Sequence, residues 1–143
     1  MELEYIYEWF QFAYVDLASA EYLLGMRPQP LEIICYHCQQ SAEKYLKGYL
    51  VYKGIDPPKS HDLVDLNDMC SGIDDRFSEI DRVCGILTRY GVQPRYPQEI
   101  EITANDTLMA IEYAQQIRTF EPLEEVRREV GQSNGEDGSE YFE

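Results

Sequence analysis

The sequence contains few of the residues that bind metal ions, with two histidines and four cysteines among 143 residues. The stretch Cys35-Tyr36-His37-Cys38 could supply half of a zinc site, because a spacing of three residues on a helix brings both thiolates to one face. Cys70 and Cys84 form no second pair of this kind, and no further histidine lies near them. We therefore expect no metal and no cofactor, and we interpret the cysteines as small apolar residues on buried helix faces.

Basic residues are also scarce. Twelve lysines and arginines stand against 27 acids, and the net charge of −15 disfavours unassisted binding to nucleic acid or to an anionic membrane. From Glu121 onward eight acids stand against Arg127 and Arg128, so this segment accounts for −6 and the first 120 residues for −9. Six of the other ten bases could form a local basic site if the predicted central helix and two loops converge: Lys44, Lys47, Lys53, Lys59, Arg89 and Arg95.

Long apolar runs and strand patterns are missing as well. No stretch approaches the roughly 18 apolar residues of a membrane span. The start of the chain, MELEYIYEWF, is acidic where a signal peptide would be basic. We therefore expect a soluble, cytoplasmic protein without a membrane segment. The sequence shows no internal repeat, no alternation of apolar and polar residues and no hairpin signal, so the predicted fold class is all-α.

The strongest helical pattern runs from Leu31 to Tyr52. Apolar or small residues recur there in alternating steps of four and three, which places them in one stripe of about six turns. A second apolar line lies beside the first, so this helix should contact two or three neighbours and form the centre of the fold. A polar patch that could be a solvated face or the wall of a charged cleft interrupts these lines: Gln39, Gln40, Glu43, Lys44 and Lys47.

Four further segments carry helical patterns. Their predicted ranges are about 3–24, 63–72, 74–90 and 104–120. Ser60 or Asp62 could cap the second of these helices. The segment 92–102 contains two prolines and is predicted to be an ordered loop.

Short links between the helices favour an up-and-down four-helix bundle with an additional short helix. An irregular helical array would satisfy the same apolar stripes. We assign residues 1–122 to the bundle and predict that residues 123–143 form an acidic, disordered C-terminal tail. The stretch from Ser133 has the Gly, Ser and acid content of such a tail, whereas residues 123–130 could add one or two helical turns.

Three motifs occur in order along the chain. Gln40-Ser41-Ala42-Glu43-Lys44-Tyr45-Leu46-Lys47 lies on the central helix, Ser60-His61-Asp62-Leu63 follows a proline-containing link, and Arg95-Tyr96-Pro97 precedes the last helix. With the matching helix lengths, residues 5–120 resemble the HEPN domain of higher eukaryotes and prokaryotes. Each motif alone is weak evidence, but the three together at this spacing are fairly specific.

The resemblance implies a bundle of four long helices with an extra short one, often as a homodimer. It also implies nucleotide binding, association with a small nucleotidyltransferase partner protein, and a role in toxin–antitoxin or stress systems. Some HEPN branches are ribonucleases. These carry an arginine, four to six intervening residues and a histidine, which can position the scissile phosphate and provide acid–base chemistry.

This sequence departs from the ribonuclease motif. Neither His37 nor His61 follows an arginine at that spacing, and Arg89 is followed after five residues by Arg95. A guanidinium group cannot act as a general base near neutral pH. We therefore expect no ribonuclease activity of this type and assign no catalytic residue.

The predicted ligand-binding residues are Lys44, Lys47, His61, Arg95 and Tyr96. Arg95 offers a planar fork for a phosphate or carboxylate, and Tyr96 offers a ring and a hydroxyl. Purely structural roles are the alternative to ligand binding. Arg95 could form an ion pair with Glu43 that holds its loop, and His61 could anchor the start of a helix. The two lysines could lie on a solvated face.

Three functions follow from these observations. The first is a HEPN-like module that binds a nucleotide or phosphate ligand and works with a separate small nucleotidyltransferase. The second is an atypical HEPN ribonuclease that uses His37, His61 or Glu43 as its base. The third is a purely structural helical interaction protein without a small ligand.

Overall fold

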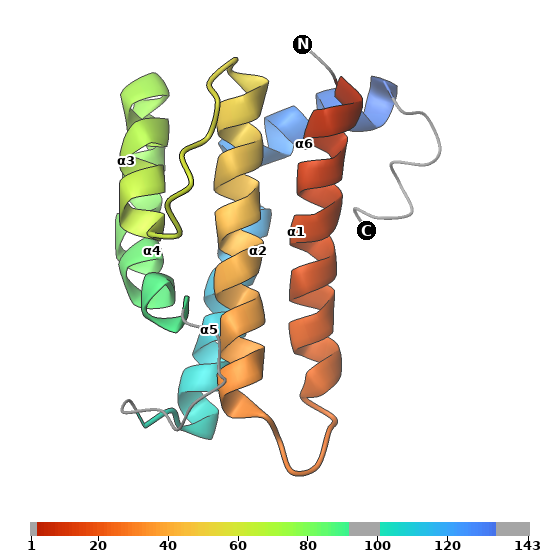
Figure 1. Cartoon of the computed structure of the whole chain (residues 1–143), viewed down its shortest axis with the longest axis vertical. Coiled ribbons are helices and arrows are strands. Elements are labelled where there is room, and N and C mark those ends of the chain that lie inside the picture. The colour runs from red at the N-terminus through yellow and green to blue at the C-terminus, as the bar shows by residue number, and fades with distance from the viewer. Residues whose placement is uncertain (1–2, 92–100, 134–143) are drawn as a thin grey trace.

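The computed structural model describes residues 3–91 and 101–133. Within these ranges the chain is helical and contains no strand (Figure 1). The α-helices are α1 (Leu3–Leu23), α2 (Leu31–Tyr52), α3 (Leu63–Ile73), α4 (Asp81–Leu87), α5 (Ala104–Arg118) and α6 (Glu121–Ser133), and the 3-10 helices are η1 (Asp75–Ile80) and η2 (Thr88–Tyr90). The predicted all-α helical bundle is confirmed.

The central position of α2 is also as predicted. Thirteen of its 22 residues are buried, which is more than one face of a helix can supply. It packs against α1 on one side and against α3 and α5 on others (Figure 1). Aromatic rings pack at the contact with α1, where the ring of Tyr45 meets that of Phe10 edge to face at 5.4 Å, and at η1, where the ring of Phe77 lies 4.5 Å from that of Tyr49.

A glycine allows α1 to approach α2 closely. A Cβ atom at Gly48 would lie 2.7 Å from Cε1 of Phe10 and 3.0 Å from Cβ of Trp9, distances that real Cβ atoms do not adopt. A buried hydrogen bond joins the same two helices, since the Ser41 hydroxyl donates to the Ala13 carbonyl at 2.7 Å. The two helices therefore pack at short range along most of their length.

The segment predicted as one helix from 74 to 90 is divided into η1, α4 and η2. A side chain from α3 takes part at the junction of η1 and α4, where the amide of Asn67 donates to the carbonyl oxygen of Phe77 at 3.0 Å. The backbone N–H of Asp81 bonds instead to the carbonyl of Ser78, which gives the tighter 3-10 turn. Asp62, one of the two predicted caps, accepts a hydrogen bond from Val64 N–H at the start of α3.

Residues 123–133 belong to α6 (Glu121–Ser133), so the helix allowed for residues 123–130 of the predicted tail is present and extends to Ser133. Leu123, Val126 and Val130 recur at helical spacing and are at most 2% exposed. Burial of these three side chains stabilises α6 although the segment is rich in acids. The remaining residues of the predicted tail, 134–143, lie outside the described residues, as do 92–100 of the predicted loop.

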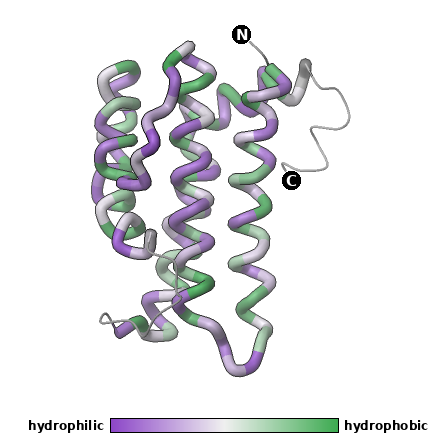
Figure 2. The backbone as a smooth tube through the Cα atoms, in the orientation of Figure 1, coloured by the Kyte–Doolittle hydropathy of each residue, from purple (hydrophilic) through white to green (hydrophobic). Residues whose placement is uncertain are grey.

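Hydrophobic and hydrophilic residues are interspersed along the helices (Figure 2). In the part of the chain that the structure describes, no helix is both long and apolar enough to cross a membrane. All four cysteines are buried and unbonded to one another, as predicted. Burial raises the pKa of Cys35 to about 11 and that of Cys84 to about 12, so these thiols stay protonated in the folded protein.

Candidate functional site

The polar patch of α2 lies largely inside the protein. Gln39, Glu43 and Lys47 are at most 7% exposed, so they do not form a solvated helix face. Their spacing of four residues places them in one line along α2, facing the loop between α2 and α3. Buried polar side chains need partners, and the partners of these three lie partly in that loop.

The carboxylate of Glu43 is the centre of this line. Its Oε2 atom lies 3.1 Å from Lys47 Nζ and 3.0 Å from His61 Nδ1. Gln39 donates from Nε2 to the Glu43 carboxylate at 3.3 Å and to the backbone carbonyl of His61 at 3.0 Å. We call these four residues, Gln39, Glu43, Lys47 and His61, the Glu43 cluster.

His61 connects the Glu43 cluster to solvent. Its side chain is 70% exposed, whereas that of Glu43 is 7% exposed. The contact with Glu43 uses Nδ1, and Nε2 has no hydrogen bond to the described residues. Because Glu43 accepts a hydrogen bond from Nδ1–H, it orients the ring and leaves Nε2 available to a ligand.

The loop that carries His61 is held at its α3 end. The backbone N–H of Leu63 donates to the Thr88 hydroxyl at 3.0 Å, which links the start of α3 to η2. The same hydroxyl donates to the Asp62 carboxylate at 3.3 Å. Together with the Gln39 bond to the His61 carbonyl, these contacts fix the backbone that carries the imidazole to three helices, which are α2, α3 and η2.

A second acid, Asp16, organises the other side of α2. Its carboxylate contacts Lys44 Nζ and lies 2.9 Å from His37 Nδ1. Gln40 donates from Nε2 to Oε1 of Gln39 at 2.7 Å and accepts a bond from Lys44 at 3.5 Å, so a chain of hydrogen bonds joins Asp16 to the Glu43 cluster. Lys44 itself points toward α1.

The structure therefore brings together two of the five predicted site residues, Lys47 and His61. Lys44 is separated from them by its contact with Asp16. Arg95 and Tyr96 lie outside the described residues. The predicted structural alternative for Arg95 was a pair with Glu43, and the described partners of that carboxylate are Lys47, His61 and Gln39.

Sequence reasoning did not assign Asp16 or Thr88 to a site, and it named Gln39 only as part of the polar patch. Gln39 had a usable signal, because it lies four residues before Glu43 on one helix face. Asp16 and Thr88 had none, since each is more than twenty residues from the residue that it contacts.

The buried part of the Glu43 cluster, Glu43 and Lys47, is close to electrically neutral. The charges of Glu43 and Lys47 cancel, and protonation of His61 would add one positive charge at the surface. The arrangement can donate a hydrogen bond to an anion or accept a proton at Nε2. Residues 3–91 and 101–133 contain no group of three or more His, Cys, Asp or Glu side chains placed to hold a metal ion.

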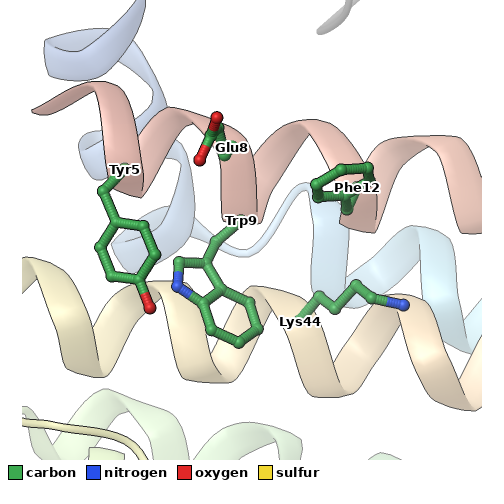
Figure 3. A pocket seen from close by; sticks show the side chains of 5 residues that line it. All are labelled: Tyr5, Glu8, Trp9, Phe12 and Lys44. Carbon is green, nitrogen blue, oxygen red and sulfur yellow. The ribbon is translucent and has the colours of Figure 1, made fainter.

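A separate groove lies between α1 and α2. Tyr5, Glu8, Trp9 and Phe12 line it from α1, and Lys44 lines it from α2 (Figure 3). Its walls are mostly aromatic, and it opens on the α1 side of the molecule rather than at His61.

Comparison with known proteins identifies a family and a solved structure to which this chain is similar. The HEPN domain family model matches residues 6–126, a range that contains the whole Glu43 cluster. The structure is similar to the crystal structure of TT1696 from Thermus thermophilus, with a TM-score of 0.70, 24% sequence identity, and coverage of 85% of this chain and 97% of that chain. No curated protein gives a match. Because the family model covers most of its length, the chain belongs to the HEPN domain family.

Proposed function

We propose that this protein is a HEPN-family binding module that holds a phosphate group of a nucleotide or RNA at His61 and Lys47. The observation that carries the proposal is the anchoring of an exposed imidazole by a buried carboxylate. Glu43 orients the ring through Nδ1, and the exposed side chain leaves Nε2 to a ligand, as an acceptor in the neutral ring and as a donor when the imidazole is protonated. A hydrogen bond from a protonated imidazole to phosphate contributes about 1.5–3 kcal/mol.

Arg95 and Tyr96 belong to the same proposed site. Glu43 already balances the charge of Lys47, so a bound phosphate requires a further cation. The described chain supports this placement at Gly91, where a Cβ atom would lie 3.2 Å from Nε2 of Gln39. Gly91, the last described residue before Arg95 in the chain, therefore lies beside the Glu43 cluster.

The proposed module acts as a homodimer with a separate small nucleotidyltransferase, in a toxin–antitoxin or stress-type system. The resemblance of the three sequence motifs to HEPN proteins is the support for this role. The charge of −15 adds a physical argument, because an acidic module associates more readily with a basic protein than with free nucleic acid.

A second candidate function is an atypical HEPN ribonuclease. The pair of Glu43 and His61 favours it, because a carboxylate that orients an imidazole is an arrangement used for general acid–base catalysis. The arginine-to-histidine motif of known HEPN ribonucleases is absent from the sequence. Sustained cleavage of RNA by the purified protein, abolished in His61→Ala, would replace the binding module with this enzyme.

Thermal unfolding in the presence of ligands tests the proposal. Nucleoside triphosphates and short RNAs at about 100 times their dissociation constant should stabilise the protein by about 2.7 kcal/mol. The shift should disappear in His61→Ala and in Arg95→Ala. It should persist in Lys44→Ala, a matched control that also removes one basic side chain but lies on the Asp16 side of α2.

Two results would contradict the proposed site. A shift that is unchanged in His61→Ala would place the ligand elsewhere, since this exposed side chain can be removed without opening the core. The absence of any shift, together with binding of a protein partner, would assign the chain to the structural interaction proteins.

A further inference from the structure

The outward face of α1 collects exposed apolar side chains. Ten large hydrophobic side chains are exposed among the described residues, and five of them follow one line along α1 and the turn after it. These five are Tyr5, Phe12, Val15, Tyr22 and Met26. Tyr22 is 85% exposed and Phe12 is 59% exposed, so they contribute little to the core of a single chain.

The spacing of this line is that of a helix–helix seam. Within α1, positions 5, 8, 12, 15, 19 and 22 are separated by alternating steps of three and four, which is the repeat of the core positions in a coiled coil, and Met26 lies in the turn after the helix. Glu8 and Ser19 occupy the two positions that are not large and apolar. The buried residues of α1 lie at other positions of the helix, and α1 packs against α2, α5 and α6. The helix thus has two apolar faces and uses one of them within the chain.

The groove of Figure 3 begins at one end of this face, at Tyr5, Glu8 and Phe12, and continues from its edge toward Lys44 of α2. Its four α1 residues, Tyr5, Glu8, Trp9 and Phe12, stand at positions i, i+3, i+4 and i+7. Four residues at this spacing form the hole that receives one side chain of a facing helix in knobs-into-holes packing. The most exposed side chain of the face, Tyr22, lies at the other end.

We propose that the outward face of α1 pairs with the same face of a second copy of the chain, antiparallel and with Val15 on the two-fold axis. In a two-fold interface residue i meets residue j and j meets i. Val15 is seven residues from Glu8 in the groove and seven from Tyr22. Antiparallel pairing about Val15 therefore brings the partner's Tyr22 over each groove, and both copies fill their holes at once.

The area of the face is adequate for a dimer. An aromatic side chain buries about 150–250 Å² when it is fully covered. The exposed fractions of the five side chains then amount to about 500 Å² per copy, or about 1,000 Å² for the pair, which reaches the lower bound of specific interfaces. The middle of the face, from Gln11 to Ser19, presents Phe12, Val15 and Ala18 without a charged residue between them on this side.

This inference deepens the homodimer of the proposed function by naming its surface, and it is independent of the ligand at His61. A second copy fits the face because both the groove and the side chain that fills it are present on one helix. A different protein partner would need only the groove or only the protruding side chain on this chain, not both.

Cysteine crosslinking tests the interface directly. Helix axes 8–10 Å apart place facing Cα atoms about 4–6 Å apart, which suits a disulfide. Under mild oxidation Val15→Cys should give a covalent dimer, and Val64→Cys on α3 should not, although the two valines are 45% and 40% exposed. The four native cysteines are buried and do not interfere.

Sedimentation of surface variants gives a second test. Phe12→Glu and Tyr22→Glu should convert a dimer to a monomer, whereas Leu108→Glu, at an exposed position of α5, should leave it a dimer. Added salt should strengthen the dimer, because each copy carries a charge of −15, and should weaken phosphate binding.

A monomeric wild type would overturn the inference, as would a dimer that persists in both glutamate variants or a Val15→Cys yield equal to that of Val64→Cys. Binding of a nucleotidyltransferase to this face in place of a second copy would also overturn it. A dimer that depends on Phe12 but shows no nucleotide shift would leave this interface standing and refute the ligand site alone.

Discussion

The pair of Glu43 and Lys47 offers the sharpest test of how the site is held. Their side chains are 7% and 8% exposed, and the two charged atoms lie 3.1 Å apart. Replacing Glu43 by leucine leaves the ammonium group of Lys47 buried without an acid. Removal of one partner from a buried ion pair costs about 3–5 kcal/mol, whereas exchange of both partners for apolar residues is near neutral.

We therefore expect Glu43→Leu to lower the free energy of unfolding by about 3–5 kcal/mol, which corresponds to roughly 10 °C in the unfolding midpoint for a domain of this size. The double variant Glu43→Leu/Lys47→Met should recover most of that loss. His61→Ala is the control, because Glu43 keeps Lys47 as a partner and the removed side chain is exposed.

Urea denaturation of the wild type and these three variants, followed by circular dichroism, measures these free energies. A loss below about 1 kcal/mol in Glu43→Leu would show that Lys47 reaches solvent easily. A double variant no more stable than the single one would show that packing, rather than the buried charge, determines the loss. Either result would refute the description of Glu43 and Lys47 as a buried ion pair whose charges cancel and which positions His61.

Three further predictions concern the rest of the fold. Calorimetry should show that ending the chain after Phe120 costs about 5–9 kcal/mol, since three buried apolar side chains of α6 are lost, while ending it after Ser133 changes little. Gly48→Ala should lower stability in urea by about 1–3 kcal/mol, because its Cβ would lie 2.7 Å from the ring of Phe10; equal stability would contradict the close packing of α1 and α2. Stability should fall above about pH 9, because burial raises the pKa of Cys35 to about 11 and the thiol ionises in the unfolded chain first. Unfolding midpoints between pH 8 and pH 10.5 measure this loss, which should be smaller in Cys35→Ala.

Long periodic helices were predictable because their pattern repeats many times. The ends of α2 agree with the predicted Leu31 and Tyr52, and the predicted Asp62 cap is present at α3. The division of residues 74–90 was not predictable, and at its junction Asn67 of α3 donates to the carbonyl of Phe77. Local patterns carry no information about such a contact.

In the segment after residue 122, composition and periodicity indicate different structures. The acidic content after residue 122 indicated a tail, yet Leu123, Val126 and Val130 had the spacing of a buried helix face. Three apolar residues in a short segment are a weak signal by themselves. Their contact with the bundle supplies the stabilisation that a short charged helix lacks in isolation.

The candidate site was likewise predictable only in part. The motif on α2 identified Glu43, Lys44 and Lys47 as residues of interest, but nothing local separates the two lysines. The structure separates them, because Asp16 on α1 draws Lys44 to one side and Glu43 holds Lys47 on the other. His61 joins Lys47 through the same carboxylate.

By itself the sequence determined that this chain is an all-α protein of the HEPN family, with α2 at its centre and with Lys47 and His61 among its candidate site residues. Periodicity and short motifs are properties of neighbouring residues, so they can be recognised in the sequence alone. The tertiary structure decided which polar residues share a carboxylate, where the bundle ends and which face of α1 is left uncovered. Each of these depends on side chains far apart in sequence competing for the same buried volume or the same hydrogen-bond acceptor.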